Sequence, residues 1–169
     1  MINIMIDVND RHNRGYYHMT TANKPQDAIA LLTAQHREVK SMFDEFENMT
    51  DRAKVSKKKL ADKICDALIM HTTIEEEILY PAVRAATKET EDMVDEAVVE
   101  HASAKDLIAQ VQEMDPGDDL YDAKVKVLGE LVEHHVEEEE EEMFPKMREL
   151  KLDLVGLGQE MAARAAELQ

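Results

Sequence analysis

Cysteine, glycine, proline and aromatic residues are all scarce in this sequence of 169 residues. The single cysteine, Cys65, excludes an internal disulfide framework and a cysteine-bound iron–sulfur cluster, and it is typical of a protein from a reducing compartment. Five glycines and four prolines are too few for a turn-rich β protein. The body of the sequence consists of alanine, leucine, glutamate, lysine and methionine, which favour helices. The composition therefore predicts an all-α fold.

Long hydrophobic runs and an excess of positive charge are missing as well. No apolar run approaches the roughly 18 residues that a membrane span needs, and residues 1–20 contain no long apolar segment typical of a secretory signal. The 37 acidic side chains outnumber the 20 lysines and arginines, which gives a formal charge of −17. Because nucleic-acid backbones and anionic membranes attract clustered positive charge, we expect neither as a partner. The sequence predicts a soluble, cytoplasmic protein.

Hydrophobic residues that recur every three or four positions predict four long helices and a short fifth one. The predicted helices span residues 25–49, 52–86, 89–114, 118–150 and 153–168. Pro25 suits the first turn of the first helix, Pro81 should kink the second, and Asp118 can cap the fourth. Long amphipathic helices joined by short connections favour an antiparallel up-down four-helix bundle, which we assign to residues 23–150.

Two segments flank the predicted bundle. Residues 1–22 show no sustained periodicity and are predicted to form a flexible lead-in, within which Met19 offers an alternative start of the chain. Residues 151–169 are predicted to form an accessory C-terminal helix, which Asp153 can cap. We expect this helix to pack outside the bundle or to contact a protein partner.

Each long helix has a predicted inward stripe, and each stripe contains one histidine. The predicted inward residues are Ile29, Leu32, His36, Val39, Phe43 and Phe46; Leu60, Ile64, Leu68 (or Ala67), His71, Glu75, Ile78 and Ala82; Val94, Val98, His101, Ile108 and Val111; Val125, Leu128, Val132, His135, Glu139 and Met143; and, in the fifth helix, Leu154, Leu157, Met161 and Leu168. Histidine and glutamate four positions apart lie on one face of a helix. Each such pair can therefore reach one ion or two adjacent ions.

The sequence contains an internal repeat that supports these assignments. Residues 71–81 read HTTIEEEILYP and residues 135–145 read HVEEEEEEMFP, so each segment has H-x-x-x-E, a run of glutamates and a proline ten residues after the histidine. His36 and His101 are separated by a similar offset. The two halves of the predicted bundle therefore repeat the same pattern of residues. Alignment on the prolines selects His135 rather than its neighbour His134.

An ionised carboxylate without a partner is very unfavourable in an apolar core, and a metal ion would supply the missing positive charge. We therefore predict a metal site made by His36, His71, Glu75, His101, His135 and Glu139. Imidazole and carboxylate ligands suit iron, with manganese or zinc as less suited alternatives. Six protein ligands for two ions leave room for a bridging oxide or hydroxide and for a small exogenous ligand.

Several neighbouring residues are alternatives or accessories to this ligand set. His134 is predicted to be exposed, and Glu138 and Glu142 are the neighbours that could replace Glu139. Glu76 is a candidate acceptor of a hydrogen bond from a ligand. Tyr80 is predicted to belong to the core, with a hydrogen bond near the site as the alternative.

The ordered set of four histidines and two H-x-x-x-E pairs resembles the hemerythrin-like HHE cation-binding family over residues 25–150. The resemblance implies a four-helix bundle with a non-haem di-iron centre, in which His36 and His71 face one iron and His101 and His135 face the other. It implies that Glu75 and Glu139 bridge the irons, together with an oxo or hydroxo group.

The sequence departs from the invertebrate oxygen carriers of that family. Their third helix has two histidines four residues apart, whereas here Lys105 stands four residues after His101. Their last helix pairs its histidine with an aspartate five residues on, whereas here Glu139 follows His135 by four. The set is more similar to bacterial HHE proteins, some of which break down peroxide.

Two kinds of function follow as expectations. The first is catalytic, with an open metal position that binds peroxide, oxygen or nitric oxide under oxidative stress, and peroxide decomposition is the reaction we favour. The alternative is a non-catalytic module that senses or binds oxygen or iron and signals through the C-terminal helix. Iron storage is a further, weaker alternative.

Overall fold

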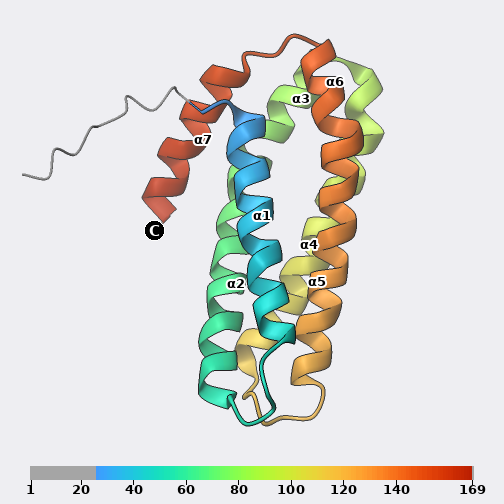
Figure 1. The fold of residues 1–169 in the computed structure, drawn as a ribbon. Helices are drawn as coiled ribbons and strands as arrows, with labels where there is room; N and C mark the ends of the chain where they lie inside the picture. The colour runs from blue at the N-terminus through green and yellow to red at the C-terminus, as the bar shows by residue number, and fades with distance from the viewer. Residues whose placement is uncertain (1–25, 169) are drawn as a thin grey trace, which may run out of the picture.

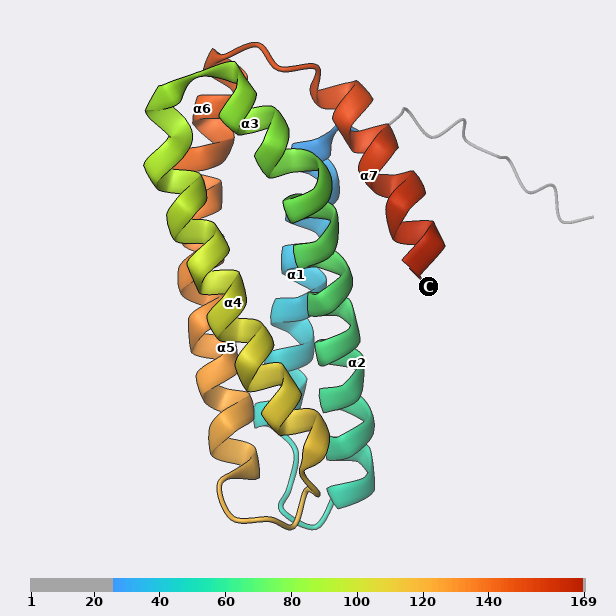
Figure 2. The ribbon, with the colours of Figure 1, turned by 180° about the vertical axis from the view of Figure 1, so that it is seen from behind.

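The computed structural model describes residues 26–168, which form helices without any β-strand. Most of these residues belong to four long helices: α1 (Ala28–Glu47), α2 (Lys54–Ile74), α4 (Glu91–Glu113) and α5 (Tyr121–Glu138). The four lie side by side in Figures 1 and 2, with α1 against α2 and α5, and α4 against the same two helices. The all-α prediction is confirmed. The predictions for residues 1–22, including Met19, lie outside the described residues.

Shorter elements extend the long helices. α2 continues through the π-helical turn η1 (Glu75–Leu79) into α3 (Tyr80–Ala86), and the short 3₁₀ helix η2 (Lys88–Thr90) leads into α4. α5 continues through a second π-helical turn, η3 (Glu139–Met143), into α6 (Phe144–Glu149). The last helix is α7 (Leu154–Leu168). No helix among residues 26–168 combines the length and apolarity that a membrane crossing needs.

Two predicted helix starts are wrong. α1 begins at Ala28 rather than near Pro25, because the side chain of Asp27 accepts a hydrogen bond from the backbone N–H of Ala30 and so caps the helix there. α5 begins at Tyr121, and Asp118 does not cap it. The Asp118 carboxylate instead accepts a hydrogen bond from the backbone N–H of Asp115 at 2.9 Å, within the loop.

A layer of polar side chains divides the interior of the bundle into two apolar cores. The distal core contains Val39, Leu68 and Ala104, among others. The α7-side core contains Leu32 and Ile74, and it extends through both π-helical turns to α7. On α1, α2 and α4 a buried histidine stands between a residue of one core and a residue of the other, so the histidines mark the boundary between the cores.

The predicted stripes are right through most of the bundle but wrong at several positions. In α4 the buried residue is Ala97, while Val98 is 38 % exposed. Beyond Glu75 the buried residues are Leu79 and Val83 instead of Ile78 and Ala82, which are only half-buried. The π-helical turn contains one more residue than an α-helical turn, so it advances the inward face by one position. Phe43 and Val132 are likewise half-buried at the edge of the distal core.

α7 packs on the outside of the bundle, as expected, against α1, α2 and η1 (Figures 1 and 2). Asp153 caps it as predicted, because its carboxylate accepts a hydrogen bond from the backbone N–H of Gly156 at 3.0 Å. Its contact face contains Gly158, Met161 and Ala165, which are buried. Leu168 was predicted on this face but is 41 % exposed, because the helix ends there at the margin of the contact.

Candidate metal centre

Both predicted glutamates begin a π-helical turn, and both turns end just before a proline. The backbone N–H of Tyr80 donates to the carbonyl of Glu75, and the N–H of Phe144 donates to the carbonyl of Glu139. A proline inside a helix lacks an N–H and crowds the carbonyl four residues earlier, and a widened turn relieves both problems. Pro81 was predicted to kink the helix or to end it nearby, and the helix continues past it as α3 and ends at Ala86. The repeated sequence therefore builds the same irregular backbone twice, and it directs both carboxylates inward.

The structure brings all six predicted ligand residues together at the boundary between the two cores. Glu75 lies at the centre of one group, with its Oε2 3.2 Å from Nε2 of His71 and 3.3 Å from Nε2 of His101. The Glu75 side chain is completely buried. Because His71 and Glu75 come from one helix and His101 from another, the group joins α2 and η1 to α4.

Glu139 lies at the centre of a second group. Its Oε2 is 3.4 Å from Nε2 of His36 on α1, and its Oε1 is 3.7 Å from Nε2 of His135 on α5. The Nε2 atoms of His101 and His135 lie 3.0 Å apart. The ligand atoms form two sets within which all atoms lie within 4.8 Å of one another, and Glu75 belongs to both: His36, His71, Glu75 and Glu139; and Glu75, His101 and His135.

Each of the four histidines has its other ring nitrogen, Nδ1, in a hydrogen bond with an acceptor outside the group. The pairs are His36–Glu140, His71–Gln35, His101–Glu76 and His135–Glu100, with distances of 2.8, 2.7, 2.9 and 2.7 Å. An Nδ1–H that donates outward leaves the lone pair of Nε2 directed inward. Such outer hydrogen bonds are the usual means of orienting metal-binding histidines.

The interior of the group has many acceptors and almost no donors. Four of its buried atoms have no hydrogen-bond partner: Nε2 of His36, both carboxylate oxygens of Glu75, and Oε2 of Glu139. Buried polar atoms are nearly always satisfied, so a cluster of unsatisfied acceptors that converge on one point calls for positive charge. Nitrogen and carboxylate oxygen ligands of this kind fit iron, manganese or zinc. The residues therefore fit a cation site.

The pKa shifts within the cluster also favour a bound cation. Burial and the charge of Glu139 raise the pKa of Glu75 well above its usual range. Burial lowers the pKa of His71 to about 3, so this imidazole is neutral at pH 7. Burial also opposes the charged form of His36, but the neighbouring carboxylate of Glu139 outweighs it and raises the pKa of His36. Without a metal ion Glu75 and His36 thus favour their protonated forms, and a bound cation would displace these protons.

The structure distinguishes the alternatives that the sequence left open. His134 is 62 % exposed in its side chain and pairs with Glu138 at 3.3 Å, and neither residue reaches the six-residue cluster. Glu142 is exposed. Glu76 accepts the hydrogen bond from His101 and also pairs with Lys105 at 2.6 Å.

Tyr80 is buried, and its hydroxyl donates to Oε1 of Glu139 at 3.1 Å. The hydroxyl also lies 3.2 Å from Nε2 of His101. Tyr80 thus belongs to the core and supplies a donor inside the cluster as well.

Sequence reasoning missed three of the outer hydrogen-bond partners: Gln35, Glu100 and Glu140. Gln35 and Glu100 each precede a predicted ligand histidine, and Glu140 occupies the position in its repeat that Glu76 occupies in the first. Gln35, Glu100 and Glu140 are each the immediate neighbour of a predicted ligand. A comparison of these neighbouring positions between the two halves of the chain would have identified all three.

The fold and the cluster together define a helical protein with a buried histidine–glutamate cation site. Residues 27–147 match the Hemerythrin HHE cation binding domain family. The chain belongs to this family.

Two similar proteins illustrate the relationship. A solved structure of a hemerythrin HHE cation binding domain-containing protein from Mycobacterium kansasii shares the fold with a TM-score of 0.71 and 26 % sequence identity, over 84 % of this chain and 86 % of that one. A protein of Nostoc sp. described as a DNA nickase is 30 % identical over 125 residues, which make up 73 % of this chain. The chain spans only about a third of the length of that relative.

Proposed function

We propose that the chain is a di-iron protein that decomposes hydrogen peroxide. In this proposal the long helices form an antiparallel up-down bundle around two iron ions and an oxo or hydroxo bridge. His36 and His71 would hold one ion, His101 and His135 would hold the other, and Glu75 and Glu139 would supply the carboxylates. The observation that carries the proposal is the set of unsatisfied buried acceptors that converge between the four helices. We further propose a cytoplasmic protein that acts under oxidative stress.

The bound ions would supply the redox change, since the site contains no nucleophile–base pair of its own. In the overall reaction one peroxide loses two electrons and two protons to become oxygen, and a second peroxide takes them up to become two waters. The protein fixes the orientation of the four imidazoles through their Nδ1 bonds. Tyr80 holds a proton at its hydroxyl oxygen, next to Glu139, because burial and the nearby carboxylates raise its pKa above the usual value.

The test measures oxygen release from hydrogen peroxide by the iron-loaded protein with an oxygen electrode. We expect the double variant His71→Ala, His135→Ala to lose both iron and activity, whereas His134→Ala retains both, because His134 lies outside the cluster. Metal analysis of each sample accompanies the traces. A wild-type rate no faster than that of the double variant would reject the proposed reaction.

A second candidate function, metal sensing through α7, has its own support. Arg164 of α7 forms a hydrogen bond to Glu77 of η1 through Nε at 2.7 Å, and Glu77 stands two residues after the ligand candidate Glu75. α7 is thereby tied to the backbone turn that positions a ligand. If the protein is a sensor, hydrogen exchange in residues 154–168 should change with metal occupancy. Exchange that ignores the metal would exclude this function.

A further inference from the structure

A small cavity adjoins the four histidines, and Glu100 is the one carboxylate that lines it. It has a volume of about 30 Å³, and neither Glu75 nor Glu139 lines it. Its apolar wall comes from the next turn of each helix toward the distal core: Val39, Leu68, Ala104 and Val132. A site for one water needs about 10–15 Å³ by this measure, so the cavity has room for two such molecules or for one peroxide.

The cavity is made by the smaller residues of the second repeat. Ala104 follows His101 by three residues, as Val39 follows His36. Val132 precedes His135 by three residues, as Leu68 precedes His71. At both pairs of positions the second half of the chain has the smaller side chain. The asymmetry therefore leaves space beside the histidines that a fully symmetric core would fill.

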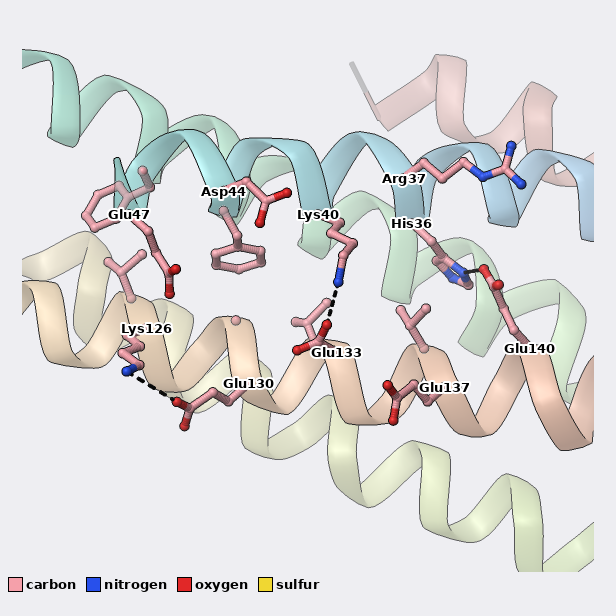
Figure 3. A pocket seen from close by; sticks show the side chains of 16 residues that line it. His36, Arg37, Lys40, Asp44, Glu47, Lys126, Glu130, Glu133, Glu137 and Glu140 are labelled. Carbon is pink, nitrogen blue, oxygen red and sulfur yellow. Dashed lines mark hydrogen bonds and ion pairs between the residues drawn. The ribbon is translucent and has the colours of Figure 1, made fainter. Parts of the chain in front are cut away.

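A groove on the surface between α1 and α5 leads toward this cavity. The groove has a volume of about 280 Å³, and it shares His36, Val132 and Val136 with the cavity. Figure 3 shows His36 at one end of the groove and the ion pair between Lys40 and Glu133 across its middle. Val132 and Val136 are both half-buried, so their side chains stand between open solvent and the cavity.

The charge of the groove favours uncharged ligands over small anions. Six carboxylates and three cationic side chains line it, and several are visible in Figure 3. A net negative wall repels small anions and leaves uncharged molecules unaffected. Hydrogen peroxide and nitric oxide are uncharged at neutral pH and match the cavity in size, whereas an alkyl hydroperoxide with a bulky group does not.

We propose that the α1–α5 groove is the access route to the metal centre, that its net negative wall disfavours anions, and that Val132, Val136 and Ala104 restrict it to ligands of two heavy atoms. This inference rests on the proposed function, because it assumes that a bound metal faces the cavity. Val132 and Val136 restrict passage, and Ala104 sets the space beside the histidines.

The experiment follows nitric oxide binding to the iron-loaded protein by stopped-flow optical spectroscopy. Val136→Phe should slow binding by about tenfold or more, and Ala104→Val should weaken it by a similar factor, since pocket size discriminates at about this level. Val127→Phe is the matched control, because Val127 lies on the same helix, is exposed and lines neither the groove nor the cavity. Iron content should be equal in all four proteins.

A widening variant tests size selection independently of any folding defect. Val136→Ala should turn over tert-butyl hydroperoxide, which the wild type should use about tenfold less well or worse. Unchanged nitric oxide rates in Val136→Phe and Ala104→Val, at full iron content, would overturn the route. A wild-type protein that holds iron and binds no nitric oxide would also overturn it, whereas one that binds nitric oxide but releases no oxygen from hydrogen peroxide would contradict the proposed function alone.

Discussion

The two halves of the bundle build the same ligand set but surround it differently. α1, α2 and η1 supply His36, His71 and Glu75, and α4, α5 and η3 supply their counterparts at an offset of 64–65 residues. The residues that would touch a metal are thus duplicated. Their surroundings are not, because Gln35 corresponds to Glu100, Tyr80 to Phe144 and Val39 to Ala104. The symmetric part can hold the ions, and the asymmetric part can determine what approaches them.

The largest expected effect tests the symmetry itself. Glu75→Gln and Glu139→Gln should each abolish high-affinity metal binding, because each removes one of the two central carboxylates. A metal present at a thousandfold excess over its dissociation constant stabilises the native state by about 4 kcal/mol, and both variants should lose that gain. Melting curves with and without a chelator, together with metal analysis, measure it.

His134→Ala is the control for both carboxylate variants and should keep the stabilisation by metal. In the metal-free state Glu75→Gln should be more stable than the wild type, because burial opposes the Glu75 carboxylate and neither of its oxygens has a donor. Glu139→Gln should instead be less stable, because it removes a carboxylate whose pKa the neighbouring histidines hold low. Loss of metal from only one of the two would show that the halves are unequal in binding as well.

A smaller effect is expected where the halves differ around a ligand. Glu100→Gln replaces the charged partner of His135 by the amide that His71 already has in Gln35. Loss of such an outer partner typically weakens metal binding by about 10- to 100-fold. Competition with a chelator measures the affinity.

Two further variants sharpen that comparison. Gln35→Glu is the reciprocal change, and it should tighten binding. Glu130→Gln is the control, because Glu130 lies on the neighbouring helix α5, is exposed and pairs with Lys126. Equal affinities for the wild type and Glu100→Gln would show that the difference between the halves is irrelevant to the metal.

α7 packs against the first π-helical turn, η1, whereas η3 makes its main contacts with α5 and α6, the segments that it joins. Gly158→Ala should loosen the packing of α7, because a Cβ there would lie 2.4 Å from the carbonyl oxygen of Gln26 and 2.7 Å from the backbone nitrogen of Ala28. Overpacking against backbone typically costs about 1–3 kcal/mol. Denaturant unfolding measures the cost.

Gly156→Ala is the matched control for Gly158→Ala. Its new methyl group would lie close to the carboxylate of Asp153, a side chain and not backbone, so the expected cost is at most that of the capping hydrogen bond, about 1 kcal/mol. Equal stability of the two variants would show that α7 is not held against α1 as closely as the structure indicates.

The regular parts of the bundle could be predicted from the sequence because helical periodicity alone determines them. Leu32, Val39 and Ile64 are buried as predicted, since they lie in uninterrupted α-helix. The prediction failed after Glu75, where Leu79 and Val83 replace Ile78 and Ala82, because a π-helical turn shifts the phase and hydrophobic spacing does not reveal such a turn. The clue was present in the proline that follows each turn.

The six residues of the cluster were found because their chemistry conflicts with their position. Histidine and glutamate at core spacing are costly without an ion, so the conflict identifies them. Glu100 and Glu140 escaped because they lie at the edge of the bundle, where a glutamate is unremarkable. Each of them accepts a hydrogen bond from Nδ1 of a histidine on another helix. Such a contact follows only from the way the helices pack.

The smallest effect concerns the one hydroxyl that distinguishes the two π-helical turns. Tyr80→Phe gives the first residue after η1 the side chain that its counterpart after η3 has in Phe144, whose ring stacks on His36 with centroids 5.9 Å apart. The Tyr80 hydroxyl donates to Glu139, so its removal leaves one more unsatisfied acceptor and should destabilise the metal-free protein by about 1 kcal/mol. Metal content should not change, because the hydroxyl does not belong to the ligand set. A double-mutant cycle with Glu139→Gln isolates this interaction. Strictly additive effects in the cycle would show that the hydroxyl contributes nothing through Glu139, and the difference between the two turns would then be one of packing alone.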